Sequence, residues 1–185
     1  MPAALLRAPV LALLVFASAC ASPRGAALRA FERGDVASAR AGWTELAERG
    51  DAESQYLLAL SHEEDDPAAA ADWYRRAAEQ GHPAAQSNLG LLRYEGRGVE
   101  RSFEEAARWF TLAAEQDFAP ARTNLGVCHL YGHGVAQDHA RARKLLERAA
   151  WDGDARAQGV LGSIHHEGFG TPVDPTEAAR WYRLA

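Results

Sequence analysis

Residues 88–117 decide the fold, and they read NLGLLRYEGRGVERSFEEAARWFTLAAEQD. A leucine–glycine pair stands near the start of this stretch, a Gly-x-Gly motif follows it, and an aromatic pair with two alanines stands near its end. The same order returns at residues 160–185, which read VLGSIHHEGFGTPVDPTEAARWYRLA. Recurrence of one pattern at a fixed spacing indicates a repeat architecture.

Columns of similar residues recur every 36 residues along the chain. The columns comprise leucines that precede glycine, Gly-x-Gly pairs, acidic or hydroxyl residues, and tryptophans with one leucine. They are Leu89, Leu125 and Leu161; Gly96/Gly98, Gly132/Gly134 and Gly168/Gly170; Asp66, Ser102, Asp138 and Asp174; and Trp73, Trp109, Leu145 and Trp181. So many columns in one register predict a repeat protein.

Each column predicts one part of a helix-turn-helix unit. The acidic and hydroxyl residues are good N-caps because their side chains accept hydrogen bonds from the first turn of a helix. Pro67 and Pro175 follow two of these caps, at the first helical position, where proline is tolerated. The Gly-x-Gly pairs supply the positive φ of a connection. A glycine inside the first helix, such as Gly126, costs about 1 kcal/mol relative to alanine, which predicts close packing by another helix.

The first repeat is shorter than the others, because residues 62–66 replace the longer glycine turn. Before it, a helical hairpin turning at Gly34 and Asp35 predicts the N-terminal cap that a solenoid needs. The chain stops at Ala185, within the second helix of the last repeat, so we expect this edge to fray or to dock onto another molecule. The expected boundaries are a cap hairpin over 27–49, a short repeat over 50–81, repeats over 82–117 and 118–153, and an incomplete repeat over 154–185.

Residues 1–20 predict an export signal. One basic residue, Arg7, precedes a short apolar run that ends in Ala-Ser-Ala-Cys, and this run is too short to span a bilayer. The small residues before Cys20 resemble a bacterial lipobox, although alanine stands at Ala17 where leucine is usual. We therefore expect lipidation of Cys20 followed by a tether over 21–26, with ordinary cleavage before Cys20 and soluble export as the alternative.

This resemblance to bacterial lipoproteins also implies a location. Alanine after the cysteine is similar to the sorting signal of enterobacterial outer-membrane lipoproteins. We expect a protein anchored by lipid to the periplasmic side of the outer membrane, or otherwise a periplasmic or secreted one. Any attachment to a membrane should come from the lipid itself, since an acidic chain is not attracted to anionic lipid.

Composition excludes several classes of function. The chain has 25 acidic and 20 basic residues, a net charge of −5, so we expect no nucleic-acid partner. Its 2 cysteines cannot build a disulfide framework or a four-cysteine zinc site. The sequence contains no GxSxG, HExxH, CxxC or GK[ST] motif. We expect no enzyme activity, no cofactor and no metal.

Histidines occupy one column of the repeats, at His62, His129 and His165, with Arg93 in the second repeat. A pH sensor or a metal track is one interpretation of this column. Polar packing between helices is the other. We favour it because equivalent helices in successive repeats lie about 10 Å or more apart, too far to share one ion. Cys128 is expected to be a half-buried, small apolar residue.

The two quoted stretches resemble Sel-one-like repeats, which are related to the tetratricopeptide repeat. The resemblance covers residues 50–185 and depends on the LG, GxG, AxxWY and AA motifs at fixed offsets. It implies a right-handed all-α solenoid whose first helices line a concave groove, and a scaffold or adaptor that binds proteins or peptides. A disulfide-rich bacterial branch of the family is linked to β-lactam binding, but its paired cysteines are missing here.

Placing the groove by analogy with the tetratricopeptide repeat selects one face of each first helix. The selected residues are aromatic, aliphatic or acidic, which suits an amphipathic or partly basic peptide. They are Tyr56, Leu60, Leu91, Tyr94, Val127, Leu130, Tyr131, His166 and Glu167. The alternative is that several of them pack against neighbouring helices.

The sequence therefore predicts an exported, non-enzymatic scaffold for a protein or peptide partner. The alternative function is an envelope module that binds or hydrolyses cell-wall fragments or β-lactams.

Overall fold

The computed structural model describes residues 22–185, which form ten α-helices and no β-strand. The helices are α1 (Pro23–Glu32), α2 (Val36–Glu48), α3 (Ala52–His62), α4 (Pro67–Glu79), α5 (Pro83–Glu95), α6 (Phe103–Glu115), α7 (Ala119–Tyr131), α8 (His139–Trp151), α9 (Ala155–Glu167) and α10 (Pro175–Tyr182). The predicted signal peptide over 1–20, with the lipidation site Cys20, lies outside the described residues. Within the described part of the chain, no helix is long and apolar enough to cross a bilayer.

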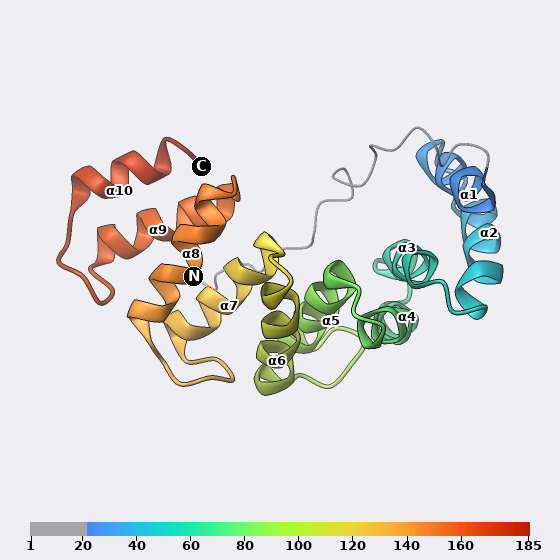
Figure 1. Ribbon diagram of the computed structural model, residues 1–185, viewed down its shortest axis with the longest axis horizontal. Coiled ribbons are helices and arrows are strands. Elements are labelled where there is room, and N and C mark those ends of the chain that lie inside the picture. The colour runs from blue at the N-terminus through green and yellow to red at the C-terminus, as the bar shows by residue number, and fades with distance from the viewer. Residues whose placement is uncertain (1–21) are drawn as a thin grey trace. The chain divides into compact units, whose positions relative to one another are not determined.

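The described residues form two compact units. The N-terminal unit comprises residues 22–101 with α1 to α5, and the C-terminal unit comprises residues 102–185 with α6 to α10. Within each unit every helix packs against the next one along the chain (Figure 1). This arrangement is the helix-turn-helix architecture that the sequence predicts.

The helix starts follow the predicted N-caps. The side chains of Asp66, Ser102 and Asp138 accept hydrogen bonds from backbone N–H groups in the first turns of α4, α6 and α8. Asp174 does the same for α10, where Pro175 stands at the first helical position. These bonds satisfy N–H groups that the helix itself leaves without partners.

The Gly-x-Gly turns also form as predicted. Gly96, Gly132 and Gly168 end α5, α7 and α9 in the left-handed region, with φ of 72°, 74° and 76°. The first repeat reaches its second helix without such a turn, because the N–H of Asp66 donates to the carbonyl of His62 at 2.8 Å.

The N-terminal hairpin begins earlier than predicted. We expected residues 21–26 to be a short polar tether, but α1 starts at Pro23. Ser22 caps this helix through a hydrogen bond from the N–H of Gly25 to its hydroxyl, at 3.1 Å, and proline is favourable at the first helical position. Arg24 also pairs with Asp51, at the start of α3, which fixes the new first turn.

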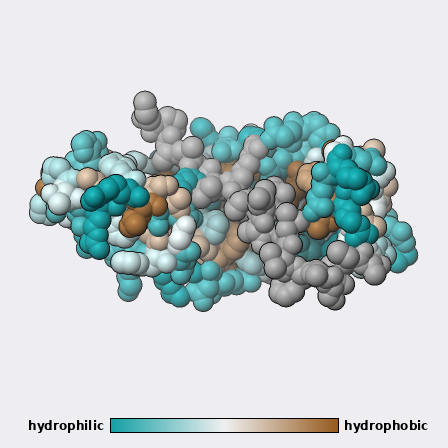
Figure 2. Space-filling model, turned by 90° about the horizontal axis from the view of Figure 1, so that it is seen from above, coloured by the Kyte–Doolittle hydropathy of each residue, from teal (hydrophilic) through white to brown (hydrophobic). Residues whose placement is uncertain are grey.

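The core combines small and large side chains. Alanines such as Ala70, Ala106 and Ala142 are fully buried, so neighbouring helices approach closely around Tyr74 and Phe110. On the face seen in Figure 2, hydrophilic residues prevail and hydrophobic ones form small separate patches. Such a surface is ordinary for a folded protein, so a binding site has to be located from its geometry.

Candidate functional site

The predicted groove in the N-terminal unit is partly core. Tyr56 is fully buried, and its ring lies 4.7 Å from the ring of His82 and 5.9 Å from that of Tyr74, between centroids. Leu91 is only 2% exposed. The assignment of these two residues to a partner surface is therefore wrong, because helix packing covers the face that the tetratricopeptide analogy selects. Leu60 and Tyr94 are partly exposed and keep their predicted role as a hypothesis.

The same correction applies in the C-terminal unit. Val127 and Leu130 are buried, so neither can contact a partner. Tyr131 is 43% exposed, and its ring lies edge-on to that of Phe169 with 6.4 Å between centroids. His166 and Glu167 are exposed at the end of α9. None of the nine predicted groove residues lines the cleft described below.

A buried polar cluster in the N-terminal unit links three side chains. The Tyr74 hydroxyl donates to the Glu63 carboxylate and accepts from the Asn88 amide at 3.0 Å. Burial raises the pKa of Tyr74 well above its usual value, and the Glu63 carboxylate raises it further. The tyrosine therefore stays protonated and serves as a hydrogen-bond donor that holds α4 against α3 and α5.

One member of the histidine column, His129, contributes to packing within its repeat. His129 is buried, and its Nδ1 lies 3.2 Å from the carbonyl oxygen of Ala136 in the turn that follows α7. Burial lowers the pKa of His62, and the nearby Arg40 lowers it further. Among the described residues no group of three metal-ligating side chains comes together.

A cleft of about 670 Å³ lies in the C-terminal unit between α6, α7 and α8. Its size falls in the range of pockets that bind small molecules or side chains. The helices α6 and α8 form its walls and α7 its floor. The lining residues are Thr111, Ala114, Glu115 and Asp117 at α6 and its end; Arg122 and Leu125 of α7; and Ala140, Arg141, Lys144, Leu145 and Arg148 of α8. A second cleft of about 300 Å³ continues along α6 and shares Thr111 and Glu115 with the first.

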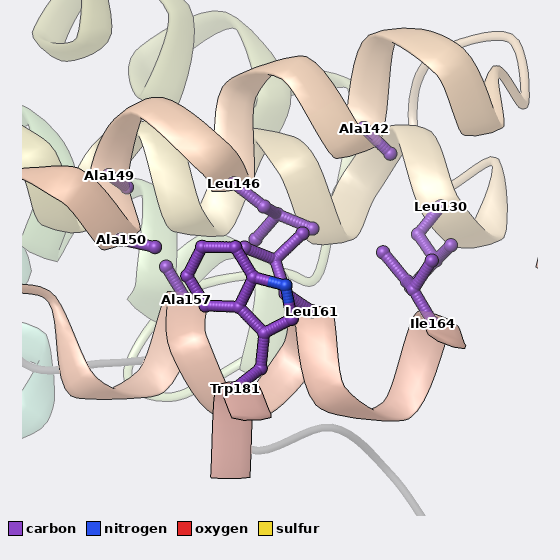
Figure 3. Packing of buried hydrophobic residues seen from close by; sticks show 9 residues of the cluster. All are labelled: Leu130, Ala142, Leu146, Ala149, Ala150, Ala157, Leu161, Ile164 and Trp181. Atoms are coloured by element: carbon purple, nitrogen blue, oxygen red, sulfur yellow. The ribbon is translucent and has the colours of Figure 1, made fainter. Parts of the chain in front are cut away.

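The corresponding space in the last repeat is filled by tryptophan. Leu145 occupies the column of Trp181, which is 8% exposed and packs against Ala150, Ala157 and Leu161. Figure 3 shows the indole of Trp181 lying among these side chains. The residues 36 positions earlier than Ala150 and Leu161 are Ala114 and Leu125, which line the cleft. The cleft therefore occupies the place where the indole would lie, because leucine is too short to fill it.

Two further departures from the repeat pattern occur at the same cleft. In the other repeats a glutamine of the first helix donates to the carbonyl of a preceding alanine, at 2.9 to 3.1 Å: Gln55 to Ala47, Gln86 to Ala78 and Gln158 to Ala150. The third repeat has Arg122 in this column.

The second departure is Asp117, which stands where Gly81 and Gly153 stand in other repeats. Asp117 is also the non-glycine residue with positive φ, 61°, among the described residues. A non-glycine residue in this region costs on the order of 1 kcal/mol or more, so the surrounding structure must hold it there.

Ion pairs connect these two residues. Arg122 is only 4% exposed, and its guanidinium lies 2.6 Å from Asp152 and 3.5 Å from Asp117. Arg148 pairs with the same Asp117 oxygen at 2.6 Å. The two arginines and two aspartates balance in charge, and they fix one end of the cleft.

Two other cations of the cleft form no ion pair with a carboxylate among the described residues. Arg141 and Lys144 are exposed on α8, and neither has a carboxylate partner among residues 22–185. Across the cleft, Glu115 is likewise unpaired in the described part of the chain.

The lining of the cleft combines apolar side chains, such as Leu145 and Ala114, with the charged side chains of α8 and of Glu115. Sequence reasoning missed this site because Leu145 was treated as one more apolar member of a column. The signal that could have found it is the change from tryptophan to leucine in that column, together with Asp117 and Arg122 in the same repeat.

Comparisons with known proteins agree with the repeat pattern. The family model of the Sel1 repeat, the Sel-one-like repeat named above, matches residues 52–82, 83–118, 119–154 and 155–185. These limits differ by at most two residues from those expected from the sequence. No curated protein matches the chain.

Solved structures share the fold. The crystal structure of a Sel1 repeat protein from Oxalobacter formigenes is 30% identical, with a TM-score of 0.75, over 92% of this chain and 75% of that one. A protective antigen of uropathogenic Escherichia coli is 32% identical with a TM-score of 0.79 over 88% of this chain, which spans only 37% of the antigen. Cysteine-rich protein B of Helicobacter pylori, at 18% identity and a TM-score of 0.54, supports the fold alone.

These matches confirm the predicted all-α solenoid. Sel1 repeat proteins are generally non-catalytic scaffolds, and the fold is compatible with a role in protein interaction. With four matched repeats that cover residues 52–185, the chain belongs to the Sel1 repeat family.

Proposed function

We propose that this protein is an exported, non-enzymatic scaffold that binds a segment of a partner protein in the cleft between α6, α7 and α8. The observation that carries the proposal is the empty space at Leu145, where the next repeat is filled by Trp181. Apolar side chains at the bottom of an open cleft, with charges at its rim, are typical of a site that buries a few side chains of a partner.

The proposed place of action is the bacterial envelope. The export signal that the sequence predicts over residues 1–20 and the lipobox-like residues before Cys20 support it. Replacement of Cys20 by serine should move the protein from the membrane fraction to the soluble fraction of the envelope. If the wild type and the serine variant were found in the membrane fraction in equal amounts, lipidation of Cys20 would be excluded.

Photo-cross-linking in cells tests the binding role. A benzophenone amino acid at Ala140, an exposed position in the cleft, should form a covalent adduct with one dominant envelope protein. The same group at Ala179, an exposed position on α10, is the control. The adduct at Ala140 should be lost when Leu145 is also replaced by tryptophan. Adducts of equal yield at Ala140 and Ala179 would contradict the assignment of the cleft as the binding site.

Leu145→Trp is a better test than a charge at a predicted groove residue. Leu91→Arg would place a guanidinium at a position that is 2% exposed, so it would unfold the helix pair rather than test binding. Leu145→Trp restores the side chain that the column has in the other repeats, and it should leave the fold intact.

A further inference from the structure

We propose that the cleft takes an acidic, amphipathic helical segment of the partner, whose carboxylates pair with Arg141 and Lys144. This inference rests on the proposed function and specifies the chemistry of the partner. It follows from three features of the cleft: the distribution of charge, the apolar floor, and the length of the walls.

The distribution of charge is unlike that of the whole chain. The chain has a net charge of −5, yet four cations and two carboxylates line the cleft. Asp117 and Asp152 neutralise Arg122 and Arg148. The remaining charges are those of Arg141 and Lys144 on α8 and of Glu115 on α6, so one net positive charge is left, and both unpaired cations lie on a single wall.

The spacing of these two cations matches a helical partner. Arg141 and Lys144 are three residues apart on α8, so they lie on the same side of the helix, separated by about one turn. A partner helix with acidic residues three or four positions apart can place one carboxylate near each cation.

The floor and the walls define the remaining chemistry of the segment. The partly exposed Leu145 and Ala114, with the buried Leu125 beneath them, provide apolar contact for one face of the partner. The wall helices α6 and α8 each have 13 residues, which corresponds to about 20 Å at 1.5 Å per residue. A partner helix of about three to four turns would run along the cleft and bury its apolar face.

Two synthetic helical peptides of 15 residues test this inference. They share leucines at helical spacing and differ in carrying glutamate or lysine at the other positions, and their binding is measured by fluorescence anisotropy at low salt. We expect the glutamate peptide to bind about tenfold more tightly, a difference of about 1.4 kcal/mol. Non-specific attraction to a chain of net charge −5 would favour the lysine peptide instead. Tighter binding of the glutamate peptide would therefore indicate that the peptide binds at the cations of the cleft.

Charge reversal provides the matched control. The double variant Arg141→Glu/Lys144→Glu should reverse the preference between the two peptides, because both positions are exposed and the fold does not depend on them. Arg180→Glu changes the same column as Lys144 in the next repeat and should leave the preference unchanged. Leu145→Trp should abolish binding of the glutamate peptide, with helicity unchanged by circular dichroism.

The other outcomes separate the two proposals. Equal binding of both peptides that is lost in Leu145→Trp would overturn the acidic partner and retain the scaffold. Absence of binding by either peptide, with a cross-link still formed at Ala140, would also overturn the acidic partner. A wild-type dimer that Leu145→Trp converts to a monomer would assign the cleft to a second copy of the chain and overturn the inference.

Discussion

At position 145 the third repeat has leucine where the other repeats have tryptophan. In the last repeat the tryptophan, Trp181, is part of the core, whereas Leu145 leaves a cleft of about 670 Å³. Asp117 and Arg122 depart from their own columns at the same place. Departures from a local pattern that cluster in space are expected at functional sites, because binding and packing require different side chains.

Cys128 gives a prediction at the residue scale. The thiol is fully buried, not half-buried as the sequence suggested, and burial raises its pKa to about 12. Since the thiolate is the reactive form, native protein with Cys20 replaced by serine should not react with a disulfide reagent at about pH 8. Reaction should follow unfolding in guanidinium chloride, and rapid labelling of the native protein would show that the thiol is accessible.

Replacing either of two glycines inside first helices by alanine should change the free energy of unfolding, in opposite directions. A Cβ at Gly126 would lie 2.8 Å from Leu146 Cγ and 3.3 Å from the carbonyl oxygen of Ala142, whereas one at Gly159 would meet no atom within 4 Å. Gly126→Ala should therefore reduce the free energy of unfolding by about 1–3 kcal/mol. Gly159→Ala should increase it by about 0.5–1 kcal/mol, because alanine favours the helix. Chemical denaturation measures both, and equal signs would contradict the packing.

At the element scale, the short first repeat has a different connection from the other repeats. Arg40 of α2 donates to both carboxylate oxygens of Asp65, at 2.8 and 2.6 Å, and to the Ser61 hydroxyl at 3.2 Å. These bonds join α2 to the turn between α3 and α4, where the other repeats have a Gly-x-Gly motif. In the first repeat, hydrogen bonds from a side chain therefore stabilise a connection that in the other repeats depends on the positive φ of glycine.

This connection predicts a dependence on pH. Hydrogen bonds from Arg40 lower the pKa of Asp65. Because the folded pKa is below that of the unfolded chain, the stabilising contribution is complete above about pH 4 and is lost as the pH falls through the folded pKa. The difference in melting temperature between wild type and Asp65→Asn should therefore be largest near neutral pH and vanish in acid. A difference that grows towards acid would contradict this assignment.

At the scale of the whole molecule, each described helix packs mainly against its neighbours along the chain within its unit. Stability in such a protein is approximately a sum of repeat terms and nearest-neighbour terms. A destabilising change in one repeat should therefore lower the stability of the adjacent helices most. Global and local unfolding can be distinguished by hydrogen exchange.

Trp43 tests this locality. Its side chain is 1% exposed in α2, and its ring lies 5.5 Å from that of Phe31, between centroids. Trp43→Ala should cost about 3–5 kcal/mol and accelerate amide exchange in α1 to α3, but leave α9 unchanged. Trp151→Ala, at a position that is 73% exposed, is the control: it removes an edge-on ring contact with Trp181, 5.9 Å between centroids, and should cost only about 1 kcal/mol. Uniform acceleration across all helices in Trp43→Ala would mean that the chain unfolds as one unit.

The sequence by itself determined the repeat, the helix-turn-helix units and their ends. These features depend on local interactions: Asp66 and Asp138 cap their helices, and Gly96 and Gly132 adopt positive φ. Each involves residues a few positions apart, so the pattern of residue types is sufficient to predict it. The start of α1 was predicted late for another reason: the tether expected after Cys20 included Ser22 and Pro23, which are the cap and the first residue of this helix.

Only the tertiary structure decided which faces are buried and where a partner can bind. Tyr56, Leu91, Val127 and Leu130 look like surface positions by analogy, yet neighbouring helices cover them. The cleft at Leu145 arises from space that three helices leave between them, which no single stretch of sequence contains. Burial and empty volume are properties of side chains from several elements together, and for that reason they appear only when the helices are packed.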